Sequence, residues 1–210
     1  MTVLSTPRHP LVAAAYRDAH ALYGDHLIEG RPALAHSAAV AAALVRHVPY
    51  ASAELTAAAL LHDLPEFAPA GVDAKAFLSG RYGEETTHVV LALAAEHHAL
   101  DQPDPPIETG DYPVLLLSTV DKAVAFGSNL HRAERTGDVP AYFAAKTALV
   151  NLLDYFRRYH QAGIGLLPVS LTDEYGHVIA QVDAALAEHR ITRHVTPVVV
   201  TSAPDAANRG

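Results

Sequence analysis

The chain has 210 residues, 50% of them hydrophobic and 18% charged, so it can fill the core of one domain and is not a wholly disordered chain. Lys and Arg number 15 against 23 Asp and Glu, and this formal net charge of −8 argues against a general binder of nucleic acid or anionic membranes. The absence of cysteine excludes disulfides, thiolate zinc sites, iron–sulfur clusters and a cysteine nucleophile.

The first half of the chain predicts a series of helices, because its apolar residues recur at helical spacing. Pro65 and Pro69 end or kink the third of these helices, since proline cannot donate the backbone hydrogen bond of a helix interior. Glu84 and Glu85 favour the start of the last one, because acidic side chains stabilise the first turn of a helix. The predicted helices cover residues 11–23, 32–49, 52–61, 74–79 and 83–98.

The second half begins with a loop and continues with helices. Residues 101–113 hold four prolines, which predicts a loop. Residues 114–126 are strongly apolar; a buried strand would fit their composition, but their length and helical neighbours favour a helix. Two more helices, at 140–160 and 172–188, flank a turn at 163–170.

The predicted fold is therefore all-α, a single helical bundle over residues 1–188. From about His189 the helical pattern is lost, so we predict a flexible C-terminal tail over 189–210, in which residues 198–200 could add a short strand. The start of the chain lacks the basic and apolar regions of a signal peptide, and no apolar stretch is long enough to span a membrane. We expect a soluble, cytoplasmic protein whose partners include neither membrane nor nucleic acid.

Four polar residues interrupt otherwise apolar helices. His36 lies in the second predicted helix, His62 and Asp63 follow the apolar run of the third, and Asp121 lies within the apolar element 114–126. Each alone has an ordinary explanation, as a core histidine, a helix cap or an exposed charge. Burying the carboxylates is costly unless they are paired or bind a metal. Two imidazoles and two carboxylates suit Mn²⁺, Fe²⁺, Co²⁺ or Zn²⁺, with water in the remaining positions, so the set predicts a metal site.

In this order, His36, His62, Asp63 and Asp121 resemble the HD-domain metal phosphohydrolases, and in particular the hydrolase domain of the stringent-response synthetase/hydrolases and the small alarmone hydrolases. The likeness extends over about residues 12–160. It implies an all-α HD-domain fold and one divalent ion held by these four residues, with Mn²⁺ as the usual ion of the alarmone enzymes. The segments that carry it are 29–41, 58–66, 82–93 and 115–122.

Three positions depart from the pattern of that family. Its central motif has a second acid after Glu66, where this chain has Phe67. Its basic cluster before the first ligand is replaced by residues 25–27, Asp-His-Leu, and its asparagine on the last-ligand helix is replaced by Ala125. The metal ligands are kept while the alarmone-recognition positions are not. This implies a phosphohydrolase with altered substrate recognition; the alternative is a genuine (p)ppGpp hydrolase.

The predicted reaction is hydrolysis of a phosphate or pyrophosphate ester of a nucleotide or a related phosphorylated metabolite. Glu66 lies one helical step from Asp63, and we expect these two carboxylates to be catalytic, orienting the attacking water or taking its proton. Lys122 and Arg31 are the predicted phosphate-binding residues. The expected substrate is a small anion, and a homodimer is an open alternative to a monomer.

Two other functions stay open. A di-iron oxygenase of the HD type needs two more histidines before the last aspartate, but His88 and His97 lie nine residues apart on one predicted helix, which disfavours a second ion. We interpret His97 and His98 as a pair at a helix C-terminus, where imidazolium interacts favourably with the helix dipole. A non-catalytic metal- or nucleotide-binding module is the other alternative, because Phe67 replaces one of the family's acids.

Overall fold

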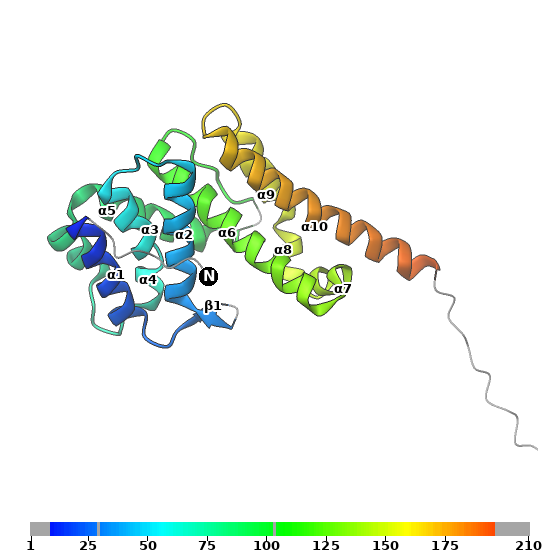
Figure 1. Cartoon of the computed structure of the whole chain (residues 1–210), viewed down its shortest axis with the longest axis horizontal. Helices are drawn as coiled ribbons and strands as arrows, with labels where there is room; N and C mark the ends of the chain where they lie inside the picture. Colours follow the sequence, from blue (N-terminus) through cyan, green and yellow to red (C-terminus); the bar gives the residue numbers. More distant parts are fainter. Residues whose placement is uncertain (1–8, 29, 103, 196–210) are drawn as a thin grey trace, which may run out of the picture.

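The computed structural model describes residues 9–28, 30–102 and 104–195, and they confirm the predicted all-α fold (Figure 1). The strands in this part of the chain form one short antiparallel hairpin, with Leu27 opposite Pro32 and Ile28 opposite Arg31. In chain order the elements are α1 (Pro10–Tyr23), β1 (Leu27–Ile28), β2 (Arg31–Pro32), α2 (Ala33–His47), α3 (Ala53–Leu61), α4 (Leu64–Phe67), α5 (Ala74–Ala99), α6 (Tyr112–Thr136), α7 (Val139–Ala144), α8 (Thr147–Asn151), α9 (Leu153–Gly163) and α10 (Val169–Val195).

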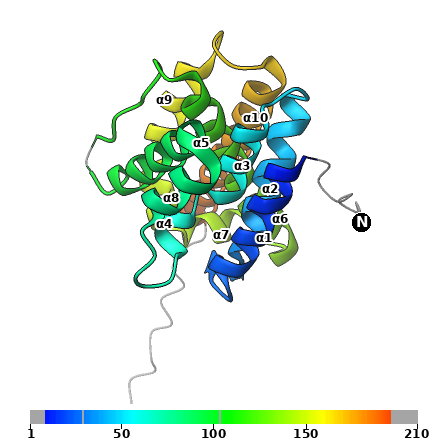
Figure 2. The same ribbon diagram turned by 90° about the vertical axis from the view of Figure 1, so that its left-hand side faces the viewer.

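Helix α3 is the centre of the N-terminal half. Every residue from Leu55 to Leu64 is buried, and α1, α2 and α5 pack around the helix (Figure 2). Three consecutive alanines, residues 57–59, are fully buried there, and their small side chains let the neighbouring helices approach closely. A side-chain cap starts the helix, because the backbone amide of Leu55 donates to Ser52 Oγ at 3.0 Å.

Helix α6 joins the two halves of the molecule. It packs against α2 and α5 at one end and against α7, α9 and α10 further along (Figure 1). Asp111 caps its first turn through the amide of Val114, and Gly137 ends it in the left-handed conformation, with φ 77°. The helix therefore continues ten residues beyond the predicted end at residue 126.

Other boundaries differ from the prediction. The two helices expected at 74–79 and 83–98 form the two arms of α5, which meet at Gly83, where φ is 82° and ψ is 174°. The single helix expected at 140–160 is divided into α7, α8 and α9, because Lys146 and Leu152 leave helical geometry. Glycine also allows the tight turn of the unpredicted hairpin, where Gly30 has φ 79°.

The last helix, α10, runs to Val195 and so passes the boundary predicted at residue 188. Residues 196–210, which include the predicted strand at 198–200 and most of the predicted tail, lie outside the described residues. Among the helices that are described, none combines the length and the apolar character needed to cross a membrane.

Candidate metal centre

Helix α3 ends at Leu61, and His62 and Asp63 connect it to α4. His62 keeps helical angles (φ −61°, ψ −30°), but Asp63 does not (φ −87°, ψ 2°), and α4 begins at the next residue. Both residues are buried, with 1% and 4% of their surface exposed. Residues 57–61, which precede them, are all apolar and buried. The end of α3 therefore places an imidazole and a carboxylate inside the protein, at the end of its central helix.

One ring nitrogen of His62 has no hydrogen-bond partner. Its Nδ1 lies 2.9 Å from the carbonyl oxygen of Ala59 and donates to it, since a carbonyl only accepts. Its Nε2 is buried, makes no hydrogen bond, and faces Asp63 Oδ1 at 3.3 Å and Asp121 Oδ1 at 3.6 Å. Metal-ligating histidines use one nitrogen for the ion and the other for a carbonyl or carboxylate. The residues therefore fit a cation at this position.

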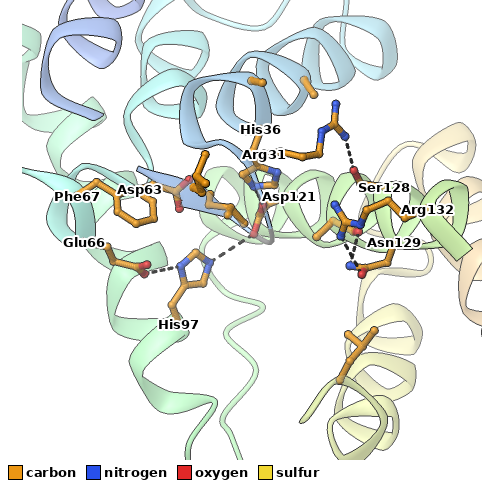
Figure 3. Close-up of a pocket in the computed structure, with 16 residues that line it drawn as sticks. Arg31, His36, Asp63, Glu66, Phe67, His97, Asp121, Ser128, Asn129 and Arg132 are labelled. Atoms are coloured by element: carbon orange, nitrogen blue, oxygen red, sulfur yellow. Dashed lines mark hydrogen bonds and ion pairs between the residues drawn. The ribbon is translucent and has the colours of Figure 1, made fainter. Parts of the chain in front are cut away.

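His36 and Asp121 complete the set predicted from the sequence. His36 Nε2, on α2, lies 2.8 Å from Asp121 Oδ1, on α6. The His36 and His62 rings lie edge to face, 5.4 Å apart. One residue along α2, Ser37 Oγ donates to Asp63 Oδ2 at 3.4 Å. Segments that are distant in the sequence thus bring the four expected ligands close to one another. Figure 3 shows three of them, His36, Asp63 and Asp121.

His97 joins this cluster, which the sequence did not lead us to expect. It lies between Glu66 and Asp121 (Figure 3), with Nδ1 3.1 Å from Glu66 Oε1 and Nε2 3.4 Å from Asp121 Oδ2. His97 and His98 do lie in the last turn of α5, as expected, but only His97 contacts the cluster; His98 is exposed, and its Nδ1 contacts the carbonyl of Ala94. We call His36, His62, Asp63, Glu66, His97 and Asp121 the metal cluster.

The charges of the metal cluster shift the pKa values of its members. Burial lowers the pKa of His97, but its hydrogen bonds with Asp121 and Glu66 outweigh this and raise the pKa to about 10. Burial likewise lowers the pKa of His62, and the carboxylates of Asp63 and Asp121 raise it to about 9. Burial raises the pKa of Asp121, yet the three histidines around it hold that pKa well below its usual range. Without a metal, protons thus supply positive charge to the cluster, and a metal ion would displace them.

A pocket of about 480 Å³ opens above the metal cluster. Glu66, Asp63 and Asp121 lie on its wall, and two guanidinium groups line it elsewhere. Arg31 donates to Ser128 Oγ at 2.6 Å, and Arg132 donates to Asn129 Oδ1 at 2.9 Å (Figure 3). The remaining wall is apolar and consists of Leu27, Ile28, Ala35, Ala39, Phe67, Ala125 and Leu149.

All three departures from the family pattern lie at this pocket. Leu27, Phe67 and Ala125 line it directly. The ring of Phe67 stacks on His26, with 5.1 Å between centroids and 28° between planes, and meets Tyr23 edge to face. The positions that carry charge in the family therefore form a partly apolar, aromatic wall in this chain.

Lys122 lies on another side of α6 and is not among the residues that line the pocket. Consecutive residues of a helix point about 100° apart, so the neighbour of an inward-facing Asp121 faces elsewhere. Only 4% of Lys122 is exposed; its ammonium pairs with Glu96 and lies 4.4 Å from the centre of the Tyr159 ring. We therefore withdraw the expectation that it binds phosphate. We call Glu96, Ser118, Lys122, Tyr155 and Tyr159 the ion-pair cluster.

No family model and no curated protein matches the sequence. The structure of the chain is similar to a solved structure, that of a metazoan ortholog of SpoT, which is described as hydrolysing ppGpp and playing a role in starvation responses. The match has a TM-score of 0.57 at 14% identity and covers 84% of this chain and 98% of that chain. At this identity the likeness shows the fold and not the activity. The chain therefore shares the fold of that structure, in agreement with the resemblance of its motifs.

Proposed function

We propose that the chain is a metal-dependent phosphohydrolase that hydrolyses a phosphate or pyrophosphate ester of a nucleotide or a related phosphorylated metabolite. One observation carries the proposal: the buried, unpartnered Nε2 of His62 faces two carboxylates at the inner wall of an open pocket. A buried arrangement of this kind fits a bound cation, and the opening gives a substrate access to it.

The proposed ligands of one divalent ion are His36, His62, Asp63 and Asp121. Two nitrogen and two oxygen donors suit a first-row ion, with Mn²⁺ as the first candidate and Fe²⁺, Co²⁺ and Zn²⁺ as alternatives. A bound ion of this type lowers the pKa of water and polarises a phosphoryl oxygen. The histidines need to be neutral to serve as ligands, so binding releases protons.

Asp63 and Glu66 are the proposed catalytic carboxylates. Both line the pocket, and the backbone amide of Glu66 donates to the carbonyl of Asp63 at 3.1 Å, which fixes the short turn between them. The Glu66 side chain is 35% exposed and contacts His97, so it reaches both the pocket and the cluster. From this position it orients the attacking water and accepts its proton.

The lining of the pocket supports an anionic substrate with an apolar part. The phosphoryl group lies at the metal cluster, and Arg31 supplies a cation at the same pocket. Leu27 and Phe67 offer an apolar and aromatic wall to a base or sugar. Because these positions differ from the family pattern, we propose altered substrate recognition. A genuine alarmone hydrolase is the second candidate, favoured by the ppGpp-hydrolysing structure of the same fold.

The test is release of phosphate or pyrophosphate from a panel of nucleotides that includes guanosine alarmones, measured with Mn²⁺. The Asp121→Ala variant should show no release above background, whereas Asp173→Ala, at an exposed position on α10, should match the wild type. Consumption of O₂ with Fe²⁺ and no phosphate release would instead identify an oxygenase. Metal and nucleotide binding without turnover would identify a binding module.

A further inference from the structure

We propose that residues 146–152, which carry α8, form a lid that closes over the pocket when a substrate binds. The inference rests on the proposed function, because it assigns a movement to the wall of the same pocket. Leu149 of α8 lines the pocket together with residues of α2, α4, α5 and α6. The position of α8 therefore sets how far the pocket is open.

Helix α8 is held less firmly than the other helices that line the pocket. None of the described residues of α8, Thr147–Asn151, is buried, whereas α2, α5 and α6 each bury part of their length. Its closest packing is against α7 and α9, its neighbours in the chain, and those two helices also pack against α6 and α10 (Figure 1). A segment with few buried apolar contacts opens at a lower free energy than the core does.

The backbone leaves helical geometry at both ends of α8. These two points are Lys146, with φ −91° and ψ 60°, and Leu152, with φ −88° and ψ 0°. Anchored residues lie just outside them, because Phe143 of α7 is fully buried and only 4% of Leu153, the first residue of α9, is exposed. Closing movements use a few residues at the ends of elements as hinges, and Lys146 and Leu152 are the hinges of this lid.

Helix α7, on the anchored side of the hinge at Lys146, is tied to the polar wall of the pocket. The hydroxyl of Tyr142 donates to Asn129 Oδ1 at 3.0 Å and accepts from Arg132 Nε at 3.2 Å. Both partners line the pocket, and Figure 3 shows the hydrogen bond between them. Because Asn129 and Arg132 lie on α6, the lid turns about a point that is fixed relative to the pocket.

Closure of the lid covers apolar side chains that solvent still reaches. Leu149, Val150 and Leu152 are half-buried, and Leu27 lines the same pocket with 61% of its surface exposed. Burying these side chains against the apolar part of a substrate is favourable, so a bound substrate shifts the lid toward its closed position. The closed lid also keeps bulk water away from the metal cluster, as lids over active sites do.

The test is the distance between two nitroxide labels, measured by double electron–electron resonance on the full-length chain. The chain has no cysteine, so labels attach only at the cysteines that are introduced. The lid pair is Ala42→Cys with Ala148→Cys, and the control pair is Ala42→Cys with Ala145→Cys. All three alanines are exposed. Ala42 lies on α2, and Ala145 and Ala148 lie on the two sides of Lys146.

The probe is guanosine diphosphate with a methylene group in place of its bridging oxygen, added with Zn²⁺, which has no unpaired electrons. Isothermal titration first shows that the probe is bound. In the free chain, the lid pair should give a broader distribution of distances than the control pair. In the complex, the distances of the lid pair should narrow and shift by several ångströms, while those of the control pair stay the same.

Equal widths for the two label pairs in the free chain overturn the lid, as does a lid pair that the bound probe leaves unchanged. Phosphate release measured in parallel separates the two proposals. Release with an unchanged lid pair overturns the lid alone. If neither the probe nor any nucleotide of the panel binds, the proposed function is contradicted. A broad lid pair in the free chain then still supports the movement of residues 146–152, and equal widths overturn it.

Discussion

Two buried groups of charged side chains lie next to each other where α5 meets α6, and they differ in how their charge is balanced. In the ion-pair cluster, Lys122 neutralises Glu96, and Ser118 Oγ donates to the same carboxylate at 2.7 Å and 2.9 Å. In the metal cluster, His97 and Asp121 occupy the adjacent positions on the same two helices, but the group contains three carboxylates and no lysine or arginine. The first group is neutralised by a lysine of the protein itself, and we propose that a metal ion neutralises most of the charge of the second.

Asp121 and Lys122 are adjacent on α6 but have different roles, because their side chains point in different directions. A turn of about 100° per residue sends Asp121 toward the pocket and Lys122 toward the tyrosines of α9. The ion pair of Glu96, on α5, with Lys122, on α6, links the two helices outside the pocket. Four predictions test the distinction between a structural and a metal-binding group, from the largest effect to the smallest.

Asp121→Ala should remove metal binding and activity together. The carboxylate contacts His36, His62 and His97, so no other side chain replaces it. We expect Mn²⁺ affinity to fall by more than about 100-fold, the upper cost of losing a residue that only supports a ligand, because here a ligand itself is lost. Isothermal titration with Mn²⁺ measures the change. A variant that binds Mn²⁺ as tightly as the wild type would contradict the proposed ligand set.

Lys122→Met should lower stability and leave the metal ligands in place. The substitution leaves the largely buried carboxylate of Glu96 without its ionic partner. Breaking a buried ion pair in this way costs about 3–5 kcal/mol of unfolding free energy. Urea denaturation of the chelated protein measures this. Replacing both partners, Glu96→Gln with Lys122→Met, should recover a large part of the loss. If Lys122→Met leaves stability unchanged, the ion-pair cluster has no structural role.

Mn²⁺ should stabilise the wild type against heat, because an ion that binds only the folded state shifts the equilibrium toward it. At a hundred times the dissociation constant the gain is about 2.7 kcal/mol. The rise in Tm should vanish in Asp121→Ala and persist in Lys122→Met, since only the first substitution touches the metal cluster. An equal rise in both variants would place the stabilising ion elsewhere.

The smallest effects come from a matched pair of serines. Ser37 Oγ contacts Asp63 Oδ2 at 3.4 Å, so Ser37→Ala should weaken Mn²⁺ binding by about tenfold with little change in stability. Ser118 contacts Glu96, so Ser118→Ala should cost about 1 kcal/mol of stability and leave Mn²⁺ affinity unchanged. Reversed outcomes would mean that the two clusters have been assigned the wrong way round.

The sequence predicted the centre of the site better than its edges. His36, His62, Asp63 and Asp121 were recognisable because each interrupts an apolar helix, where a buried polar group requires a partner. His97 was missed, although it shares a helical face with the buried Val90 and Leu93, and that spacing was the signal that pointed inward.

The polar wall of the pocket was missed for another reason. Ser128, Asn129 and Arg132 lie on the part of α6 beyond the predicted end, and Gly137, a typical residue after a helix C-terminus, was the available sign that the helix continued. The division of 140–160 into three helices had no comparable signal, since tertiary packing decides where such a segment breaks.

The most direct test of the proposed metal-dependent hydrolysis is phosphate release by the wild-type chain before and after chelation. We predict release from at least one nucleotide with Mn²⁺, loss of release when the ion is removed, and recovery when Mn²⁺ is returned. Release that survives complete chelation would contradict the account, and so would Mn²⁺ bound at the metal cluster with no release from any nucleotide of the panel.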